Sequence, residues 1–272
     1  MLDPPPDTPQ TVGSQLPERA GSPAVERDQL VAFYDDSYAR EGEQALLYSR
    51  WRALGAQGKA DHVIELCSRA GIMPSSTLEV GCGDGALLCE LRRRNFGGGV
   101  HGVEITQAAV KIASERAEID SVELYDGQHL KDADGAYDLG IVSHVLEHVP
   151  DPATLLAEVA RACRAVVVEV PLEDNLSARR GGKREHAEQV GHLQRLSRES
   201  ARAMVSQAGL RVAGELEDAL PLKVHRFFAD TPARNAAAVG RWGVRRGLRL
   251  LAPPLARRLF TVHYACLCLP RS

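Results

Sequence analysis

The chain has 272 residues, of which 33 are basic and 36 acidic, so its overall charge is close to neutral. This length suits one large α/β domain with insertions and leaves little room for two independent cores. A near-neutral balance gives no electrostatic reason to expect nucleic acid as a partner.

The N-terminal segment, residues 1–26, is rich in proline and polar residues and is predicted to be a disordered tail. It lacks a basic start followed by an apolar core, so it does not resemble a signal peptide. The six cysteines have neither CxxC spacing nor the density of a disulfide scaffold. No apolar run reaches the roughly 18 residues of a spanning helix. These features favour a cytoplasmic protein.

Residues 27–76 are rich in helix formers with apolar residues at spacings of three and four, and we expect two or three helices that cover the core. From Thr77 the pattern changes to short β-rich runs that alternate with helical segments. The predicted strands are 77–80, 99–104, 121–125, 137–143 and 165–170, and the helices are 86–94, 107–117 and 152–163. Strict alternation implies right-handed crossovers and a parallel sheet with helices on both faces.

Residues 172–198 interrupt this alternation with charged residues and glycines, and a loop of this length is typical of a lid or an unstructured segment. A helix at 200–208 and strands at 210–217 and 262–269 complete a core predicted to span residues 77–272. A basic insertion, about 225–260, separates the last two strands.

The basic insertion lies in a region, 231–272, that has eight arginines and no carboxylate side chain. One interpretation is a substrate cap or a homodimer surface. Another is a membrane-surface helix that serves a lipid-like acceptor. A third is an ordinary solvated face over a small core. Nucleic acid is disfavoured, because no aromatic stacking platform accompanies the charge.

The most informative stretch is LEVGCGDGALL, residues 78–88, in which three glycines follow a predicted strand. In an open α/β sheet, ligands bind beyond the carboxyl ends of the strands, and glycines there allow the backbone to approach closely. The G-x-G-x-G spacing differs from the G-x-G-x-x-G of dinucleotide sites, and no G-K-[ST] follows as in a P-loop. The carboxylates of Glu79 and Asp84 favour a cationic ligand over a triphosphate. An NAD-dependent or nucleotide-sugar enzyme is therefore disfavoured.

Three further stretches follow in order: HGVEI at 101–105, YDGQ at 125–128 and SHVLEHVPDP at 143–152. With these four stretches, the chain resembles the class I S-adenosylmethionine-dependent methyltransferases over about residues 77–209. Within that family it is similar to the small-molecule type common in quinone and natural-product biosynthesis. The resemblance implies an α/β, Rossmann-like, mostly parallel seven-stranded sheet with helices on both faces, an N-terminal helical cover and a C-terminal insertion.

The resemblance also implies how a cofactor is held. A carboxylate that ends the second strand accepts from the ribose hydroxyls in the family, which assigns this role to Glu104, nineteen residues after Gly85. An aspartate typically takes the adenine amino group, which points to Asp126. The implied donor is S-adenosylmethionine, with S-adenosylhomocysteine as product. The implied cofactor-binding residues are Tyr38, Glu79, Gly81, Gly83, Gly85, Glu104, Ile105, Asp126, Gly127 and Ser143.

Methyl transfer is an in-line displacement at a carbon that the sulfonium already activates, so the enzyme mainly supplies proximity and orientation. A base is needed only where the acceptor carries a proton that must leave, and histidine is the usual candidate for a hydroxyl. The predicted catalytic residues are His144, at the end of the fourth strand, and His192, which resembles a recurrent histidine of the family. His148 is interpreted as structural and His186 as solvated.

Residues 144–148 also fit the H-x-x-E-H pattern of inverted zinc proteases. That chemistry needs a long helix, whereas here a strand leads in and prolines follow at 150 and 152. No metal ligand is therefore predicted, and metal dependence stays open.

The predicted function is S-adenosylmethionine-dependent methyl transfer to a small-molecule acceptor, with a hydroxyl favoured. The alternatives are N- or C-methylation of a lipid-like or quinone-like acceptor, and a catalytically inactive cofactor-binding scaffold. The identity of the acceptor is not encoded in the motifs, because its pocket is built from the lid and the cap, where the resemblance fades.

Overall fold

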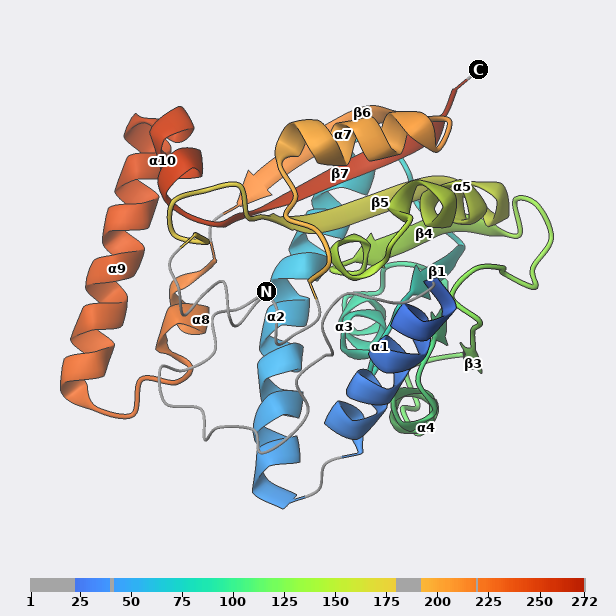
Figure 1. The fold of residues 1–272 in the computed structure, drawn as a ribbon, viewed down its shortest axis with the longest axis horizontal. Helices are drawn as coiled ribbons and strands as arrows, with labels where there is room; N and C mark the ends of the chain where they lie inside the picture. The colour runs from blue at the N-terminus through green and yellow to red at the C-terminus, as the bar shows by residue number, and fades with distance from the viewer. Residues whose placement is uncertain (1–22, 40–41, 180–191, 219, 272) are drawn as a thin grey trace.

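A seven-stranded sheet forms the centre of the molecule (Figure 1). The structure is a computed structural model that describes residues 23–39, 42–179, 192–218 and 220–271. The strand order is β3-β2-β1-β4-β5-β7-β6. Strands β1 to β5 are parallel to one another, and β7 runs antiparallel between β5 and β6. The predicted mostly parallel seven-stranded sheet is confirmed. The strands are β1 (Ser76–Val80), β2 (Gly99–Glu104), β3 (Ser121–Leu124), β4 (Tyr137–Ser143), β5 (Cys163–Leu172), β6 (Leu210–Asp218) and β7 (Val262–Pro270).

Helices precede and connect these strands, and a 3-10 turn, Leu146–His148, follows β4. Helix α1 begins at Pro23, inside the predicted tail, whose residues 1–22 lie outside the described residues. The predicted lid lies partly outside them too, at 180–191. The helices are α1 (Pro23–Tyr38), α2 (Gly42–Arg69), α3 (Ala86–Arg93), α4 (Gln107–Ser114), α5 (Pro152–Ala162), α7 (Arg198–Gln207), α8 (Leu222–Arg226), α9 (Pro232–Leu251) and α10 (Pro253–Leu259).

The core is divided by the sheet into two apolar layers. Along β4, Leu139 and Ile141 pack with α2 and α3, while Val142 packs on the other side with α5. The same alternation runs along the valine-rich strand β5. Strands that are buried on both faces have near-continuous apolar sequences, and β-branched residues fit the pleated surface. The core therefore fixes which strand residues point toward each layer.

Several helices begin at residues whose side chains cap the free backbone N–H groups. Asp151 accepts from Thr154 N ahead of α5, and Ser197 forms a capping box with Ser200 ahead of α7. Thr231 accepts from the third residue of α9 and is followed by a proline at the first helical position. These capping residues set where each helix begins. The observed starts of α5 and α7 lie within two residues of the predicted starts at 152 and 200.

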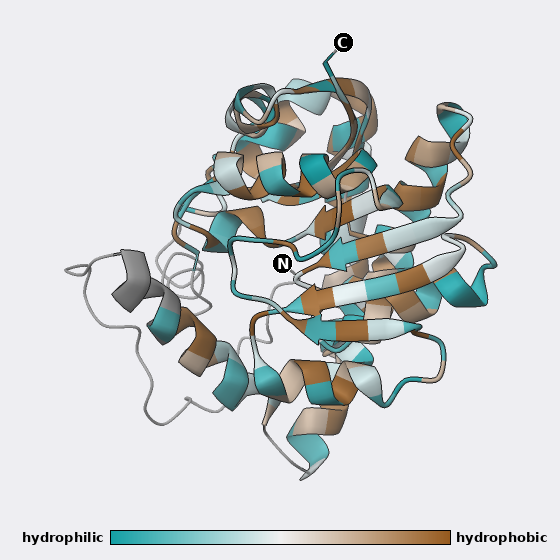
Figure 2. Ribbon diagram, turned by 90° about the vertical axis from the view of Figure 1, so that its right-hand side faces the viewer, coloured by the Kyte–Doolittle hydropathy of each residue, from teal (hydrophilic) through white to brown (hydrophobic). Residues whose placement is uncertain are grey.

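The carboxyl ends of the parallel strands meet at one edge of the sheet, as the arrowheads in Figure 2 show. Helices α8 to α10 form the insertion between β6 and β7, and α9 lies at the periphery in Figure 1. Among the described residues, no helix combines the length and the apolar character that crossing a bilayer would require. The loops at the carboxyl edge bring the predicted site residues together.

Candidate active site

The glycine loop after β1 folds back over β2. Gly81 N donates to Val103 O at 2.9 Å, and Gly81 and Gly83 have φ values of 74° and 55°, which favour glycine. A Cβ on Gly83 would collide with the Tyr38 hydroxyl, and one on Gly81 would lie 2.5 Å from Val145 Cγ2. The loop is therefore shaped so that backbone, without side chains, borders the space above β1.

Three buried carboxylates surround this loop, and their partners differ. Asp84 pairs with Arg52 at 2.8 Å and with Arg116 at 3.2 Å. Its charge is therefore neutralised within the chain, which differs from the sequence interpretation that it would attract a cation. Glu104 instead accepts backbone N–H bonds from Gly83 at 2.9 Å and Ile105 at 2.7 Å.

Of these three carboxylates, Glu79 is the one that can still accept a hydrogen bond or pair with a cation. It is 4% exposed, and in the described part of the chain its Oε2 has no hydrogen-bond partner. Burial raises the pKa of Glu79 to about 8, although the positive charge of Lys59 acts in the opposite direction. A cationic ligand group beside Glu79 would satisfy this oxygen and favour its ionised form.

A pocket of about 530 Å³ lies beyond β2 and β3 and is lined by Ile105 and Asp126. Asp126 Oδ1 accepts from the backbone N–H groups of Gln128 and His129, both at 2.7 Å. Burial acts to raise the pKa of Asp126, but these two hydrogen bonds outweigh it and lower the pKa. Gly127, with φ of 82°, forms the turn between them. This pocket has the position that the sequence assigns to the adenine end of the cofactor.

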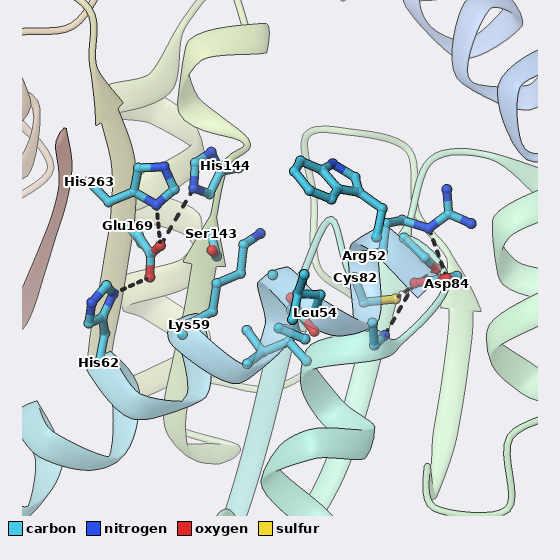
Figure 3. Close-up of a pocket in the computed structure, with 18 of the residues that line it drawn as sticks. Arg52, Leu54, Lys59, His62, Cys82, Asp84, Ser143, His144, Glu169 and His263 are labelled. Atoms are coloured by element: carbon cyan, nitrogen blue, oxygen red, sulfur yellow. Dashed lines mark hydrogen bonds and ion pairs between the residues drawn. The ribbon is translucent and has the colours of Figure 1, made fainter. Parts of the chain in front are cut away.

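A second pocket, of about 310 Å³, extends from the glycine loop toward β5 and β7 (Figure 3). At one end it is lined by Glu79, Gly81 and Gly83, and at the other by histidines and a carboxylate. Ser143, at the end of β4, lines the middle. Glu104 lines neither pocket, but its carboxylate accepts from Gly83, which lines the 310 Å³ pocket, and from Ile105, which lines the 530 Å³ pocket.

The far end of the 310 Å³ pocket is built around the fully buried carboxylate of Glu169 on β5. Its Oε2 lies 3.1 Å from Nδ1 of His62, while Oε1 lies 3.5 Å from Nε2 of His144 and 3.3 Å from Nδ1 of His263. We call His62, His144, Glu169 and His263 the Glu169 cluster. In Figure 3 its three imidazoles converge on one carboxylate.

The members of the Glu169 cluster differ in their proton affinity. Burial acts to raise the pKa of Glu169, but the surrounding histidines hold it well below its usual range. Burial opposes the charged form of His62, yet its contacts with Asp218 and Glu169 raise its pKa to about 10. Burial lowers the pKa of His144, and that of His263 to about 3. The cluster thus combines a charged His62–Glu169 pair with two neutral imidazoles.

His144 connects this cluster to a second carboxylate. Its backbone has φ of 58°, an uncommon value for a residue with a side chain, and its Nδ1 lies 3.2 Å from Glu147 Oε1. Strained backbone of this kind persists where the surrounding structure holds it, and it is concentrated at functional sites. The turn after β4 therefore aims one imidazole between two buried carboxylates.

His192 lies elsewhere. Its side chain is 1% exposed, its Nδ1 lies 2.8 Å from Glu173 Oε2, and its ring centroid is 4.7 Å from that of His148. His148 lines the 310 Å³ pocket and its Nδ1 lies 3.0 Å from the Tyr34 hydroxyl, but His192 lines neither pocket. The structure thus places only one of the two predicted catalytic histidines beside the open space.

The remaining predicted residues also divide into those that line a pocket and those that do not. Tyr38 lines the 310 Å³ pocket with its hydroxyl over Gly83 and its ring 4.8 Å from the Arg52 guanidinium. Gly85 lines neither pocket, and its missing Cβ leaves space for the side chain of Ile119.

Sequence reasoning missed three of the four residues in the Glu169 cluster. One signal was available: Glu169 is a lone charge in the run AVVVEVPL, and a charge inside a buried strand needs partners. Its partners are invisible locally, because His62 is on α2 and His263 is on β7, opposite Pro171 in the antiparallel register.

Solved structures with the same architecture include methyltransferases. A geranyl diphosphate methyltransferase solved with GPP and sinefungin aligns with a TM-score of 0.63 at 13% identity, over 91% of this chain and 100% of that one. Magnesium protoporphyrin IX methyltransferase from Synechocystis PCC 6803, with bound SAH, gives 0.58 at 14% identity over 90% and 100%. This likeness shows that the chain has the Rossmann-like fold of these methyltransferases.

Residues 49–214 match the methyltransferase domain family, so the chain belongs to this family. Among curated relatives, the ubiquinone biosynthesis O-methyltransferase of Acinetobacter baylyi is 30% identical over 103 residues, or 36% of this chain. The enzyme of the same name from Thiobacillus denitrificans is 34% identical over 103 residues, or 35% of this chain. The matches span 41% and 42% of those relatives.

Proposed function

We propose that this chain transfers the methyl group of S-adenosylmethionine to a hydroxyl of a small-molecule acceptor. The observation that carries the proposal is the 310 Å³ pocket, because it joins Gly81 and Glu79 at one end to His144 and Glu169 at the other. One end suits a cationic methyl donor and the other offers groups that handle a proton. We call them the donor end and the acceptor end.

The donor end fits the cofactor on grounds of the chain's own geometry. Glu79 Oε2 and Ser143 Oγ are buried polar atoms without a hydrogen-bond partner among the described residues, and both residues line the pocket. Gly81 and Gly83 leave backbone exposed where side chains would collide with the surroundings. We propose that Glu79 holds the ammonium group, and that Ile105 and Asp126 hold the adenine end in the 530 Å³ pocket.

The acceptor end would orient the hydroxyl and accept its proton. When bound, the sulfonium supplies an electrophilic methyl carbon, so that an O–C bond forms as the C–S bond breaks. His144 is the predicted catalytic residue that lines the pocket, and burial lowers its pKa, so it is neutral at physiological pH. A neutral imidazole accepts a proton, whereas an imidazolium would repel the sulfonium. We therefore place His144, and not His192, at the acceptor oxygen.

The contacts of the basic insertion support the interpretation that it forms a cap over the acceptor. Pro221 and Val224, at its start, line the 310 Å³ pocket. Trp51 of α2 also lines it, and its ring lies 5.0 Å from Phe227 and 4.7 Å from Phe228. This aromatic contact joins the insertion to α2 beside the pocket. Of the interpretations offered for the insertion, these contacts favour the substrate cap.

Oxygen is favoured over nitrogen or carbon for two reasons. The curated relatives matched here are named ubiquinone biosynthesis O-methyltransferases. In addition, a hydroxyl must lose its proton, and the Glu169 cluster gathers titratable groups beside the pocket. An amine that is already deprotonated needs no such arrangement.

Two measurements test the proposal. Isothermal titration should show one S-adenosylmethionine bound per chain. Incubation with isotopically methyl-labelled donor and a panel of phenols, catechols, aliphatic alcohols and amines should transfer label to hydroxylated compounds. Absence of donor binding would contradict methyl transfer of any kind. Donor binding with no labelled product across the panel would favour the inactive scaffold, and exclusive labelling of amines would favour N-methylation.

A further inference from the structure

The Glu169 cluster contains a second arrangement that proton transfer alone does not require. Glu169 Oε1 lies 3.5 Å from His144 Nε2 and 3.3 Å from His263 Nδ1, and the three ligand-type atoms all lie within 4.8 Å of one another. The three residues come from the turn after β4, from β5 and from β7. In the described part of the chain, no donor is aligned to hydrogen-bond Glu169 Oε1.

These separations match those of a metal site. Four ligand atoms at about 2.0–2.1 Å from a tetrahedrally coordinated cation are roughly 3.3 Å apart. The two measured separations, 3.3 and 3.5 Å, are close to this value. The third separation, between the two histidine nitrogens, is within 4.8 Å, so the imidazoles would move closer together around a bound cation.

We propose that His144, Glu169 and His263 bind one divalent first-row transition cation, with Zn²⁺ as the ion of choice. Two imidazoles and one carboxylate form a ligand set that suits Zn²⁺ or Fe²⁺, whereas Mg²⁺ and Ca²⁺ prefer oxygen ligands. Three protein ligands leave at least one coordination position open.

The outer partners of these ligands support the assignment. A metal-bound histidine usually donates its other ring N–H to a carboxylate, and a bound carboxylate is itself hydrogen-bonded. His144 Nδ1 lies 3.2 Å from Glu147, so an N–H there leaves Nε2 to face Glu169 and the cation. His62 Nδ1 lies 3.1 Å from the other oxygen of Glu169. Both supporting partners are thus in place.

A neighbouring group, Glu147, His148 and His192, also has its ligand atoms within 4.8 Å. It fits less well, because Glu147 Oε1 lies 4.0 Å from His148 Nε2, and because His148 is its one member that lines either pocket. The proposed site also differs from the H-x-x-E-H pattern: it uses only the first histidine of that pattern, and its other ligands come from distant strands.

The proposed cation would face the acceptor. All three ligands line the 310 Å³ pocket next to Ser143, so the open coordination position points into the space where we place the acceptor. A coordinated hydroxyl loses its proton to solvent more readily, and the remaining oxyanion attacks the methyl carbon as the C–S bond breaks. In this step, which rests on the proposed function, His144 is a ligand, and the cation replaces it as the group that promotes loss of the hydroxyl proton. The binding of the cation itself does not rest on it.

The test begins with the full-length chain freed of metal by chelation. Co²⁺ titration should give visible ligand-field absorption that saturates at one ion per chain, and Zn²⁺ should abolish that absorption by displacement. Elemental analysis after dialysis should find one zinc per chain. Excess Mg²⁺ should displace neither ion.

Variants locate the site. His263→Ala and Glu169→Gln should each weaken Co²⁺ binding by at least about 100-fold. Glu147→Gln, which alters an outer partner, should weaken it by about 10-fold. His101→Ala changes a histidine that lines neither pocket and should leave binding unchanged. Circular dichroism identifies any variant that fails to fold, and Glu147→Gln then carries the comparison because it keeps all three ligands.

Absence of stoichiometric binding by the folded wild-type chain would overturn the proposal. So would equal Co²⁺ affinity in the wild type and in the folded ligand variants. Titration of S-adenosylmethionine into the metal-free chain separates the two proposals: donor binding without cation binding refutes the metal site alone, and the reverse refutes the proposed methyl transfer alone.

Discussion

The two ends of the 310 Å³ pocket are built in different ways. The donor end is a contiguous stretch, in which Glu79 near the end of β1 and Gly81 and Gly83 in the following turn fall within five positions. The acceptor end joins α2, the turn after β4, β5 and β7, so its four cluster residues span positions 62 to 263. A local motif specifies the first, and only the completed sheet specifies the second.

This difference predicts how each end responds to change. The donor end depends on backbone shape and on the exclusion of side chains, so one added methyl group can block it. The acceptor end depends on several side chains that support one another, so single losses there should be partial. The following experiments use this contrast, from the largest expected effect to the smallest.

Gly83→Val should reduce the affinity for S-adenosylmethionine by at least about 1000-fold, measured by isothermal titration. The new side chain would meet the Tyr38 hydroxyl, and its positive φ disfavours a β-branched residue. The matched control is Gly240→Ala, because a Cβ there meets nothing within 4 Å. Normal donor binding by a folded Gly83→Val protein would show that the loop is not the donor site.

His144→Ala should lower kcat by about 100-fold with the acceptor found in the labelling screen, since a positioned acid–base group contributes on that order. The affinity for the methyl donor should change little. The comparison variant is His192→Asn, which keeps a donor toward Glu173 and should retain kcat within about threefold. Equal losses in the two variants would contradict the placement of His144 alone at the acceptor.

His62→Gln should lower the free energy of unfolding by about 2 kcal/mol in chemical denaturation, as expected for the loss of a buried hydrogen bond to a charged group. The pKa of His62 is raised to about 10, so its contribution is fully present below the unfolded value near 6.5. It is lost as the pH rises toward 10. The difference between variant and wild type should therefore shrink across that range, and a constant difference would argue against a charged His62.

Glu79→Gln should weaken donor binding by about 10-fold at pH 8. The pKa of Glu79 is raised to about 8, so the free protein is protonated there at pH 6.5, and a cationic ligand favours the ionised form. Binding at pH 6.5 should then release close to one proton in the wild type. Titration in buffers of different ionisation enthalpy measures this number, and the variant corrects for the ligand's own amino group. An unchanged proton count would remove Glu79 from the donor site.

Sequence reasoning worked where short-range rules decide the outcome. The bounds predicted for β2 and β4 agree with the structure, because β-branched residues and flanking turns mark both ends. Strand β5 extends from Cys163 to Leu172, beyond the predicted 165–170, since it pairs with β4 from Cys163 and with β7 as far as Leu172. The loop at Gly81 and the carboxylate at Glu104 were visible as local spacing.

The acceptor end could not be predicted in the same way. His263 meets Glu169 only because the insertion of α8 to α10 brings β7 back antiparallel between β5 and β6. Asp84 shows the opposite failure of sequence-based prediction. It has the position of a ligand-binding carboxylate, but its charge is already paired with Arg52 and Arg116. Residue identity indicates what a side chain can do, whereas tertiary contacts decide whether it is available.

Helix α2 links the two ends of the pocket. It carries Arg52, which pairs with Asp84 in the glycine loop, and His62, which pairs with Glu169 (Figure 3). Ten residues of helix measure about 15 Å, and this length is set by the helix rise alone. One continuous helix therefore sets the distance between the donor end and the acceptor end of the pocket. Inserting a single alanine between residues 54 and 58 would rotate one half by about 100° and disconnect the two ends while leaving both sets of residues in the sequence.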